Sequence, residues 1–124
     1  MQEVIPIMKK QKEGVIINIS SGTALMFLPN MSAYSSLKRA SVGISLTARE
    51  ELKDDNISVS VVYPYITLTD FEKNTIRENG KIEIEENDDG PPYSADSLEY
   101  VAEKILEGIK SEKAEIFAHD WMKR

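Results

Sequence analysis

Apolar runs alternate with helical patterns along the chain, and this alternation restricts the possible fold more than any other feature. Runs rich in Val and Ile lie at 15–20 and 57–63, and a shorter run lies at 114–118. Strands that alternate with helices pair in parallel through right-handed crossovers and form a layered α/β sheet. The sequence therefore predicts the order helix–strand–helix–strand–helix–strand, with three parallel strands, of which the first is expected to be buried.

Three helices are expected to separate or precede these strands. Residues 1–13 are typical of a helix end that stops at Gly14, and the lack of a cap at its start suggests missing sequence upstream. A second helix is predicted at 32–52, and a third at about 96–111, starting with a capping-box pattern and carrying the clearest amphipathic stripe. The apolar stripe of the second helix consists of Ala33, Leu37, Ala40, Ile44 and Thr47.

Two loops follow the carboxyl ends of the first two strands, and ligands of parallel α/β sheets bind at that edge. The first loop spans 22–31, and the second starts at Pro64 and is expected to include a short helix before about residue 79. Residues 80–93 are acidic and contain Gly-Pro-Pro, which predicts a mobile surface segment.

Composition excludes several classes of function. A net charge of −6 argues against nucleic acid as a partner, and Lys9, Lys10 and Lys12 are better explained as cations at a helix C-terminus. No apolar run reaches the ~20 residues of a membrane span. The 124 residues contain no cysteine, which excludes disulfides and thiolate sites and fits a reducing compartment, so a cytoplasmic location is expected.

Tyr34 and Lys38 are four residues apart near the start of the second helix, which places their side chains on one face. A cation beside a phenol stabilises the phenolate, so such a pair can transfer a proton. Ser20 and Ser21 end the preceding strand, where a hydroxyl can hydrogen-bond a carbonyl oxygen. On spacing alone a chance pair and ordinary turn serines are the more frequent explanation.

The surrounding residues change this balance. Asn18-Ile19-Ser20-Ser21 followed by Tyr34-Ser35-Ser36-Leu37-Lys38 resembles the catalytic segment of the short-chain dehydrogenase/reductase family, in which a serine lies about a dozen residues before a Tyr-x-x-x-Lys pair. Ser21 lies 13 residues before Tyr34 and fits better than Ser20. The run Val61-Val62-Tyr63-Pro64-Tyr65-Ile66-Thr67-Leu68-Thr69 is similar to the family's next strand, followed by Pro-Gly and a threonine.

The resemblance implies an NAD(P)-dependent oxidoreductase that interconverts a carbonyl and an alcohol, with NAD or NADP as cofactor and a small-molecule carbonyl or alcohol as substrate. Tyr34 would be the general acid/base, Lys38 would hold the nicotinamide ribose hydroxyls, and Ser21 would orient the substrate carbonyl. The cofactor would also contact main-chain groups near Pro64 and Ile66, and Thr69 on its phosphate side. The expected substrate wall consists of Met26, Phe27 and Leu68.

The sequence also departs from the family's pattern. The Gly-rich phosphate turn is absent, so residues 1–124 are interpreted as the C-terminal half of one Rossmann-like, doubly wound domain whose nucleotide-binding half is missing. Tyr65 stands where a glycine is usual, and the segment Phe117-Ala118-His119-Asp120-Trp121 near the end of the chain lacks the Asp-Gly-Gly that is common in the family. An alternative hypothesis is a catalytically incomplete chain that acts only by binding or dimerisation.

Self-association is expected on two surfaces. The strand at 15–20 would have lost a neighbour from the missing half, and an unpaired apolar edge recruits another strand. In the family the helix matching 32–52 pairs with its symmetry mate, and Ala40, Gly43 and Ala48 are small enough for close approach. The sequence therefore predicts a dimer or a larger homo-oligomer, or a chain that is found only beside its own N-terminal half.

Other polar residues are assigned ordinary roles. His119 is the only histidine, and a surface position is favoured over a catalytic one. The acidic cluster at 83–89 is favoured as a solvated loop, because the spacing of a calcium loop is missing, and no metal site is expected. Leu68, Phe71 and Ile76 fit equally a substrate lid and packing against the sheet.

Overall fold

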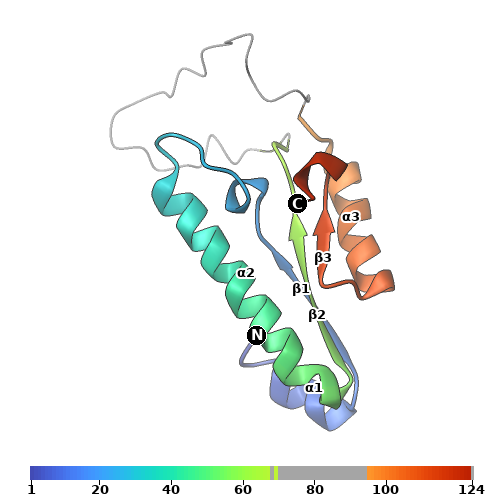
Figure 1. Cartoon of the computed structure of the whole chain (residues 1–124). Helices are drawn as coiled ribbons and strands as arrows, with labels where there is room; N and C mark the ends of the chain where they lie inside the picture. Colours follow the sequence, from blue (N-terminus) through green and yellow to red (C-terminus); the bar gives the residue numbers. More distant parts are fainter. Residues whose placement is uncertain (68, 70–94, 124) are drawn as a thin grey trace.

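The computed structural model describes residues 1–67, 69 and 95–123 (Figure 1). Within these residues the helices and strands alternate in the predicted order, which confirms the α/β class. The elements are α1 (Ile5–Gln11), β1 (Gly14–Ile19), α2 (Ser32–Leu52), β2 (Ile57–Tyr63), α3 (Leu98–Ser111) and β3 (Glu115–Phe117), with short 3-10 turns η1 (Gly22–Ala24), η2 (Lys53–Asp55) and η3 (Asp120–Met122).

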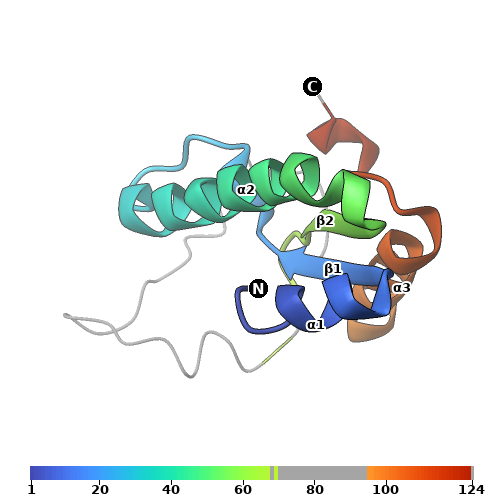
Figure 2. The same ribbon diagram turned by 90° about the horizontal axis from the view of Figure 1, so that it is seen from below.

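The three strands form one parallel sheet in the order β1-β2-β3. Successive side chains of a strand point to opposite faces, so neighbouring residues of β1 report which helix covers which face. Asn18 donates a hydrogen bond to Ser45 of α2, whereas the adjacent Ile17 lies against Gly108 of α3. Helices α2 and α3 therefore cover opposite faces of the sheet, which is the doubly wound arrangement (Figure 2).

The core of the sheet is β2, whose Val59, Val61, Val62 and Tyr63 are fully buried. One face of β2 carries Ile57, Val59, Val61 and Tyr63, and the other carries Ser58, Ser60 and Val62. Every residue of the strand except Ser58 is buried, because helices cover both faces. The Tyr63 hydroxyl donates to a Glu115 carboxylate oxygen at 2.6 Å. Burial, and then this carboxylate, raise the pKa of Tyr63 above its ordinary range, so the phenol stays protonated and serves as a structural donor.

The first helix ends earlier than the sequence indicates, and Gly14 has another function. Helix α1 ends at Gln11, and Lys12 takes a left-handed conformation with φ 60°. Gly14 is the first residue of β1, where a Cβ would come within 2.5 Å of the Met8 sulfur. The glycine is needed because α1 lies directly on the start of the strand. Strand β1 itself is only half-buried, which corrects the expected buried strand, because it is the sheet edge among the described residues.

The predicted bounds of α2 are confirmed at both ends, but its apolar stripe faces away from the sheet. Leu37 is 71% exposed and Ile44 is 60% exposed. On the inner face Ser45 accepts a hydrogen bond from Asn18 of β1, and the apolar Val42 and Leu46 pack against the core. The buried residues of this helix are Ser35, Ser45, Ala48 and Leu52.

Helix α3 begins at Leu98, close to the predicted start, and its N-cap is Ser97, whose hydroxyl accepts from the Tyr100 N–H at 3.1 Å. A full capping box is not formed, because Tyr100 occupies the position from which a Glu would return the bond. Strand β3 is shorter than the predicted 114–118. The short helix expected before residue 79, the acidic segment at 80–93 and the candidate lid residues lie outside the described residues.

None of the helices in the described part of the chain is both long and apolar enough to cross a membrane.

Candidate active site

The loops after β1 and β2 are joined directly at the carboxyl edge of the sheet. The N–H of Ser20 donates to the Val62 carbonyl at 2.8 Å, and the N–H of Gly22 donates to the Pro64 carbonyl at 2.7 Å. A Cβ on Gly22 would lie 3.0 Å from the Met122 methyl and 3.4 Å from the Pro64 oxygen, so a glycine permits this approach. The two loops that the sequence analysis assigned to ligand binding therefore lie side by side.

Tyr34 and Lys38 lie in the first two turns of α2, beside this edge. The Lys38 ammonium nitrogen is 5.7 Å from the centroid of the Tyr34 ring, and it donates to the Ile19 carbonyl at 3.3 Å. Both side chains are half-buried. The last carbonyl of β1 thus holds the cation near the phenol, as the four-residue spacing predicted.

Ser20 has a positioning role that the sequence did not reveal. Its buried hydroxyl donates to the backbone carbonyl of Lys38 at 3.1 Å, and Ser41 donates to the same carbonyl at 2.7 Å. The end of β1 is therefore fastened to α2 at the residue that carries the ammonium group. A serine aimed at a helix carbonyl is engaged there, which favours Ser21 as the residue facing a substrate.

Ser21 caps η1 and remains half-buried at the edge. Its hydroxyl oxygen accepts from the Thr23 N–H at 3.2 Å and from the Thr23 hydroxyl at 3.0 Å. A hydroxyl that accepts two bonds still carries its own proton, which it can donate. The two bonds orient the Ser21 oxygen so that a carbonyl oxygen can receive that proton as a hydrogen bond.

The predicted wall residues differ in their surroundings. Met26 is half-buried, whereas Phe27 is 81% exposed and lies under the guanidinium of Arg39, with 4.5 Å between the ring centroid and the Cζ atom. Leu68 lies outside the described residues.

On the second loop Pro64 lies against Gly22, while Ile66 and Thr69 are exposed. The Ile66 carbonyl accepts from the Asp96 N–H at 2.7 Å, so this loop is tied to the segment that leads into α3. The cofactor contacts expected of Pro64, Ile66 and Thr69 stay predictions.

The two departures noted at Tyr65 and at the C-terminus contact each other. The Tyr65 ring meets the ring of Trp121 edge-on at 5.2 Å and that of His119 at 6.0 Å. Burial, and then the charge of Asp96, raise the pKa of Tyr65 above its usual 10.0, so it stays protonated at neutral pH. An aromatic cluster therefore occupies the place of the glycine and the usual ending.

The structure also corrects the expected surface position of His119. Its side chain is 20% exposed, and Nε2 lies 3.0 Å from a carboxylate oxygen of Asp96, which is buried. A buried carboxylate requires such a partner. Sequence alone could not pair two residues that lie 23 positions apart.

No group of residues able to hold a metal ion occurs among the described residues, and the acidic cluster at 83–89 lies outside them.

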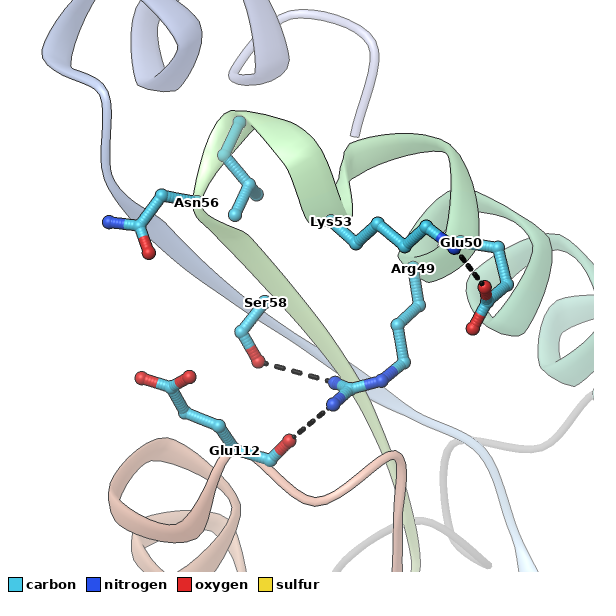
Figure 3. A pocket seen from close by; sticks show the side chains of 7 residues that line it. Arg49, Glu50, Lys53, Asn56, Ser58 and Glu112 are labelled. Carbon is cyan, nitrogen blue, oxygen red and sulfur yellow. Dashed lines mark hydrogen bonds and ion pairs between the residues drawn. The ribbon is translucent and has the colours of Figure 1, made fainter.

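A pocket of about 270 Å³ opens at the other end of the sheet, where Arg49, Lys53 and Glu112 surround the start of β2 (Figure 3). The candidate site is the carboxyl edge, where Tyr34 and Lys38 lie beside each other on α2 and Ser21 begins the loop after β1.

Comparison with known proteins identifies a family model and curated relatives that match the chain. A family model described as short chain dehydrogenase matches residues 1–80. The chain is 37% identical over 71 residues to a 3-oxoacyl-[acyl-carrier-protein] reductase from Synechocystis sp., a match that covers 57% of this chain and 29% of that reductase. The chain thus spans less than a third of the length of this curated relative.

Solved structures share the fold. A short-chain dehydrogenase from Sphingobium yanoikuyae, in complex with NADPH, superposes with a TM-score of 0.74 at 20% identity, over 94% of this chain and 41% of that one. A short-chain dehydrogenase from Burkholderia cenocepacia J2315, in complex with NADP, gives a TM-score of 0.72 at 23% identity, over 95% and 44%. At these identities the likeness concerns the fold.

Proposed function

The chain belongs to the short-chain dehydrogenase family, and from that premise we propose that it is the C-terminal, catalytic half of an NAD(P)-dependent oxidoreductase that interconverts a carbonyl and an alcohol. The observation that carries the proposal is the position of the Lys38 ammonium group, held by the Ile19 carbonyl beside the Tyr34 ring. A cation fixed near a phenol is what proton transfer by that phenol requires.

Each residue has a defined part in the reduction of a carbonyl. Ser21 donates a hydrogen bond to the carbonyl oxygen and fixes its position. Tyr34 donates its phenolic proton to that oxygen as negative charge develops, and Lys38 stabilises the phenolate that remains. Bound NAD(P)H supplies the hydride that reduces the carbonyl carbon. In the oxidation of an alcohol the Tyr34 phenolate takes the hydroxyl proton.

The residues present fit the nicotinamide end of such a cofactor. The Ile19 carbonyl takes one of the three N–H donors of Lys38, and others can reach ribose hydroxyls. Pro64, Ile66 and Thr69 would line the cofactor along the second loop. The sequence contains no Gly-rich phosphate turn, so we propose that another segment supplies the nucleotide-binding half and that residues 1–124 complete it. A cytoplasmic location stays a prediction.

The complete domain, in which a nucleotide-binding half is joined to residues 1–124, provides the test. NADPH or NADH oxidation is followed at 340 nm after a panel of ketones and aldehydes is added. Oxidation that depends on the carbonyl compound supports the proposal. A folded domain that oxidises neither cofactor with any carbonyl compound contradicts it.

The exposed apolar surfaces support self-association of the chain. Ile19 is 43% exposed on the edge strand, and Leu37 and Ile44 are exposed on the outer face of α2. A Cβ on Gly43 would meet nothing within 4 Å, so a second helix can approach there. Ala48 does not contribute as expected from the sequence, because it is buried against the sheet.

We predict that the 124-residue chain sediments as a dimer or larger species at high micromolar concentration. Ile44→Glu places a charge on the outer face of α2 and is expected to shift the chain toward monomer. Leu106→Glu, on the exposed side of α3, is the matched control and is expected to leave the association unchanged. A well-folded wild-type monomer at that concentration would contradict the prediction.

A further inference from the structure

Arg39 follows Lys38 on α2 and reaches across to the loop after β1. Its Nε donates to the Ala24 carbonyl at 2.7 Å, and a terminal nitrogen donates to the Met26 carbonyl at 2.7 Å. Its Cζ atom lies over the Phe27 ring. A planar guanidinium can hold two acceptors in a fixed geometry while it stacks on an aromatic ring. One side chain therefore fixes the carbonyls and the ring of this loop together.

The ring that Arg39 holds is unusual in its exposure. Phe27 keeps 81% of its surface accessible, although burial of a large apolar side chain is favourable. The ring stands on the loop that begins at Ser21, at the carboxyl edge of the sheet. An accessible aromatic ring on the loop that follows the carboxyl end of β1 is suited to contact the apolar part of a ligand.

Two neighbouring columns of side chains on α2 have different roles. Tyr34 and Lys38 occupy one column at a spacing of four residues, and Ser35 and Arg39 occupy the next. Ser35 is buried, and Arg39, one turn further along, remains exposed while its guanidinium lies over Phe27. The first two turns of the helix thus carry the proton-transfer pair and, beside it, the support of the loop.

We infer that Arg39 is a positioning residue that sets substrate specificity. By holding Met26 and Phe27, it presents an apolar wall to the larger substituent of the carbonyl substrate. The inference rests on the proposed function and names its substrate class, which is ketones with an aromatic or bulky apolar substituent.

Two variants and one control isolate this role. Arg39→Met keeps the length of the side chain but removes both hydrogen bonds and the charge over Phe27. Arg39→Lys keeps the charge but cannot hold both carbonyls in the guanidinium geometry. The control is Arg49→Met: Arg49 also lies on α2 and donates to two carbonyls, of Val59 and Glu112, but it does so at the opposite end of the sheet (Figure 3).

Steady-state kinetics of the complete domain compare two probe ketones, 1-phenyl-1,2-propanedione and 2,3-butanedione, which differ by a phenyl group in place of a methyl. We expect Arg39→Met to lower the ratio of their kcat/KM values about tenfold, through a higher KM for the phenyl ketone. Arg39→Lys should lie between Arg39→Met and the wild type. The KM for NADPH should stay unchanged, since within the described part of the chain the hydrogen bonds of Arg39 go to the loop after β1. Arg49→Met should keep the wild-type ratio.

A second readout does not depend on activity. The N–H groups of Leu25 and Met26 donate to the carbonyls of Gly22 and Thr23, so their hydrogen exchange reports opening of the loop. In the 124-residue chain Arg39→Met should accelerate exchange of these two amides, and Arg49→Met should not. Unchanged exchange, or an unchanged ratio in an active enzyme, would overturn the inference. A wild-type domain inactive on every ketone would overturn the proposed function, and the inference with it.

Discussion

Tyr34→Phe in the complete domain is expected to lower kcat about a thousandfold, which lies within the range that general acid catalysis contributes. The substitution removes only the phenolic hydroxyl and keeps the half-buried ring that lies below the Lys38 ammonium group. Ketone reduction then lacks its proton donor, while the cofactor and the carbonyl compound still bind. The kcat is measured as NADPH oxidation at saturating ketone.

Two further variants complete this experiment, one as a control and one as a test of Lys38. Ser36→Ala removes a hydroxyl from the same turn of α2, where Ser36 is exposed, and should keep the wild-type rate. Lys38→Ala should lower kcat and also raise the KM for NADPH, because the ammonium group is proposed to serve both Tyr34 and the ribose. A Tyr34→Phe enzyme with a rate within tenfold of the wild type would show that the proton comes from elsewhere.

Residues 1–124 alone are expected to show no saturable binding of NADPH up to about 1 mM. Most of the charge of a dinucleotide is on its phosphates, which are bound by backbone N–H groups of a Gly-rich turn and a helix N-terminus. That turn is absent from this sequence, so the nicotinamide contacts would act without the phosphate contacts. Trp121, the only tryptophan, allows a fluorescence titration through quenching and energy transfer.

The complete domain is the positive control for this titration and should saturate at micromolar NADPH. Hydrogen exchange must first show that the amides of the buried strand β2 are protected in the 124-residue chain. This control distinguishes a folded chain that does not bind NADPH from an unfolded one. Micromolar affinity of the folded 124-residue chain for NADPH would contradict the proposal that another segment supplies the nucleotide-binding half.

The best-predicted elements are those whose sequence and surroundings agree. The bounds of α2 and β2 follow from a long helical pattern and from a β-branched run that ends at Pro64. The family resemblance then places Ser21 and Tyr34 at the carboxyl edge, where the structure has them. Local patterns were sufficient to place these side chains, because the spacing along one helix and the end of one strand determine where they lie.

What the sequence could not provide depends on contacts between distant residues. The outer stripe of α2 resembles a core-facing stripe, since periodicity does not distinguish packing on the sheet from packing on a partner. The bond from Ser20 to the Lys38 carbonyl, and those from Arg39 to the loop after β1, are invisible in local patterns because serine and arginine occur at turns and on surfaces everywhere. The pairing of His119 with Asp96 likewise requires the fold.

The most direct test of the central claim follows the hydride itself. The complete domain is incubated with a reducible ketone and NADPH deuterated at nicotinamide C4 on the transferred side, and the alcohol product is analysed by mass spectrometry and NMR. We predict deuterium on the carbinol carbon, and formation of the labelled alcohol about a thousandfold more slowly by Tyr34→Phe. Alcohol that carries no deuterium on that carbon, or labelled alcohol formed equally fast by Tyr34→Phe, would contradict this prediction.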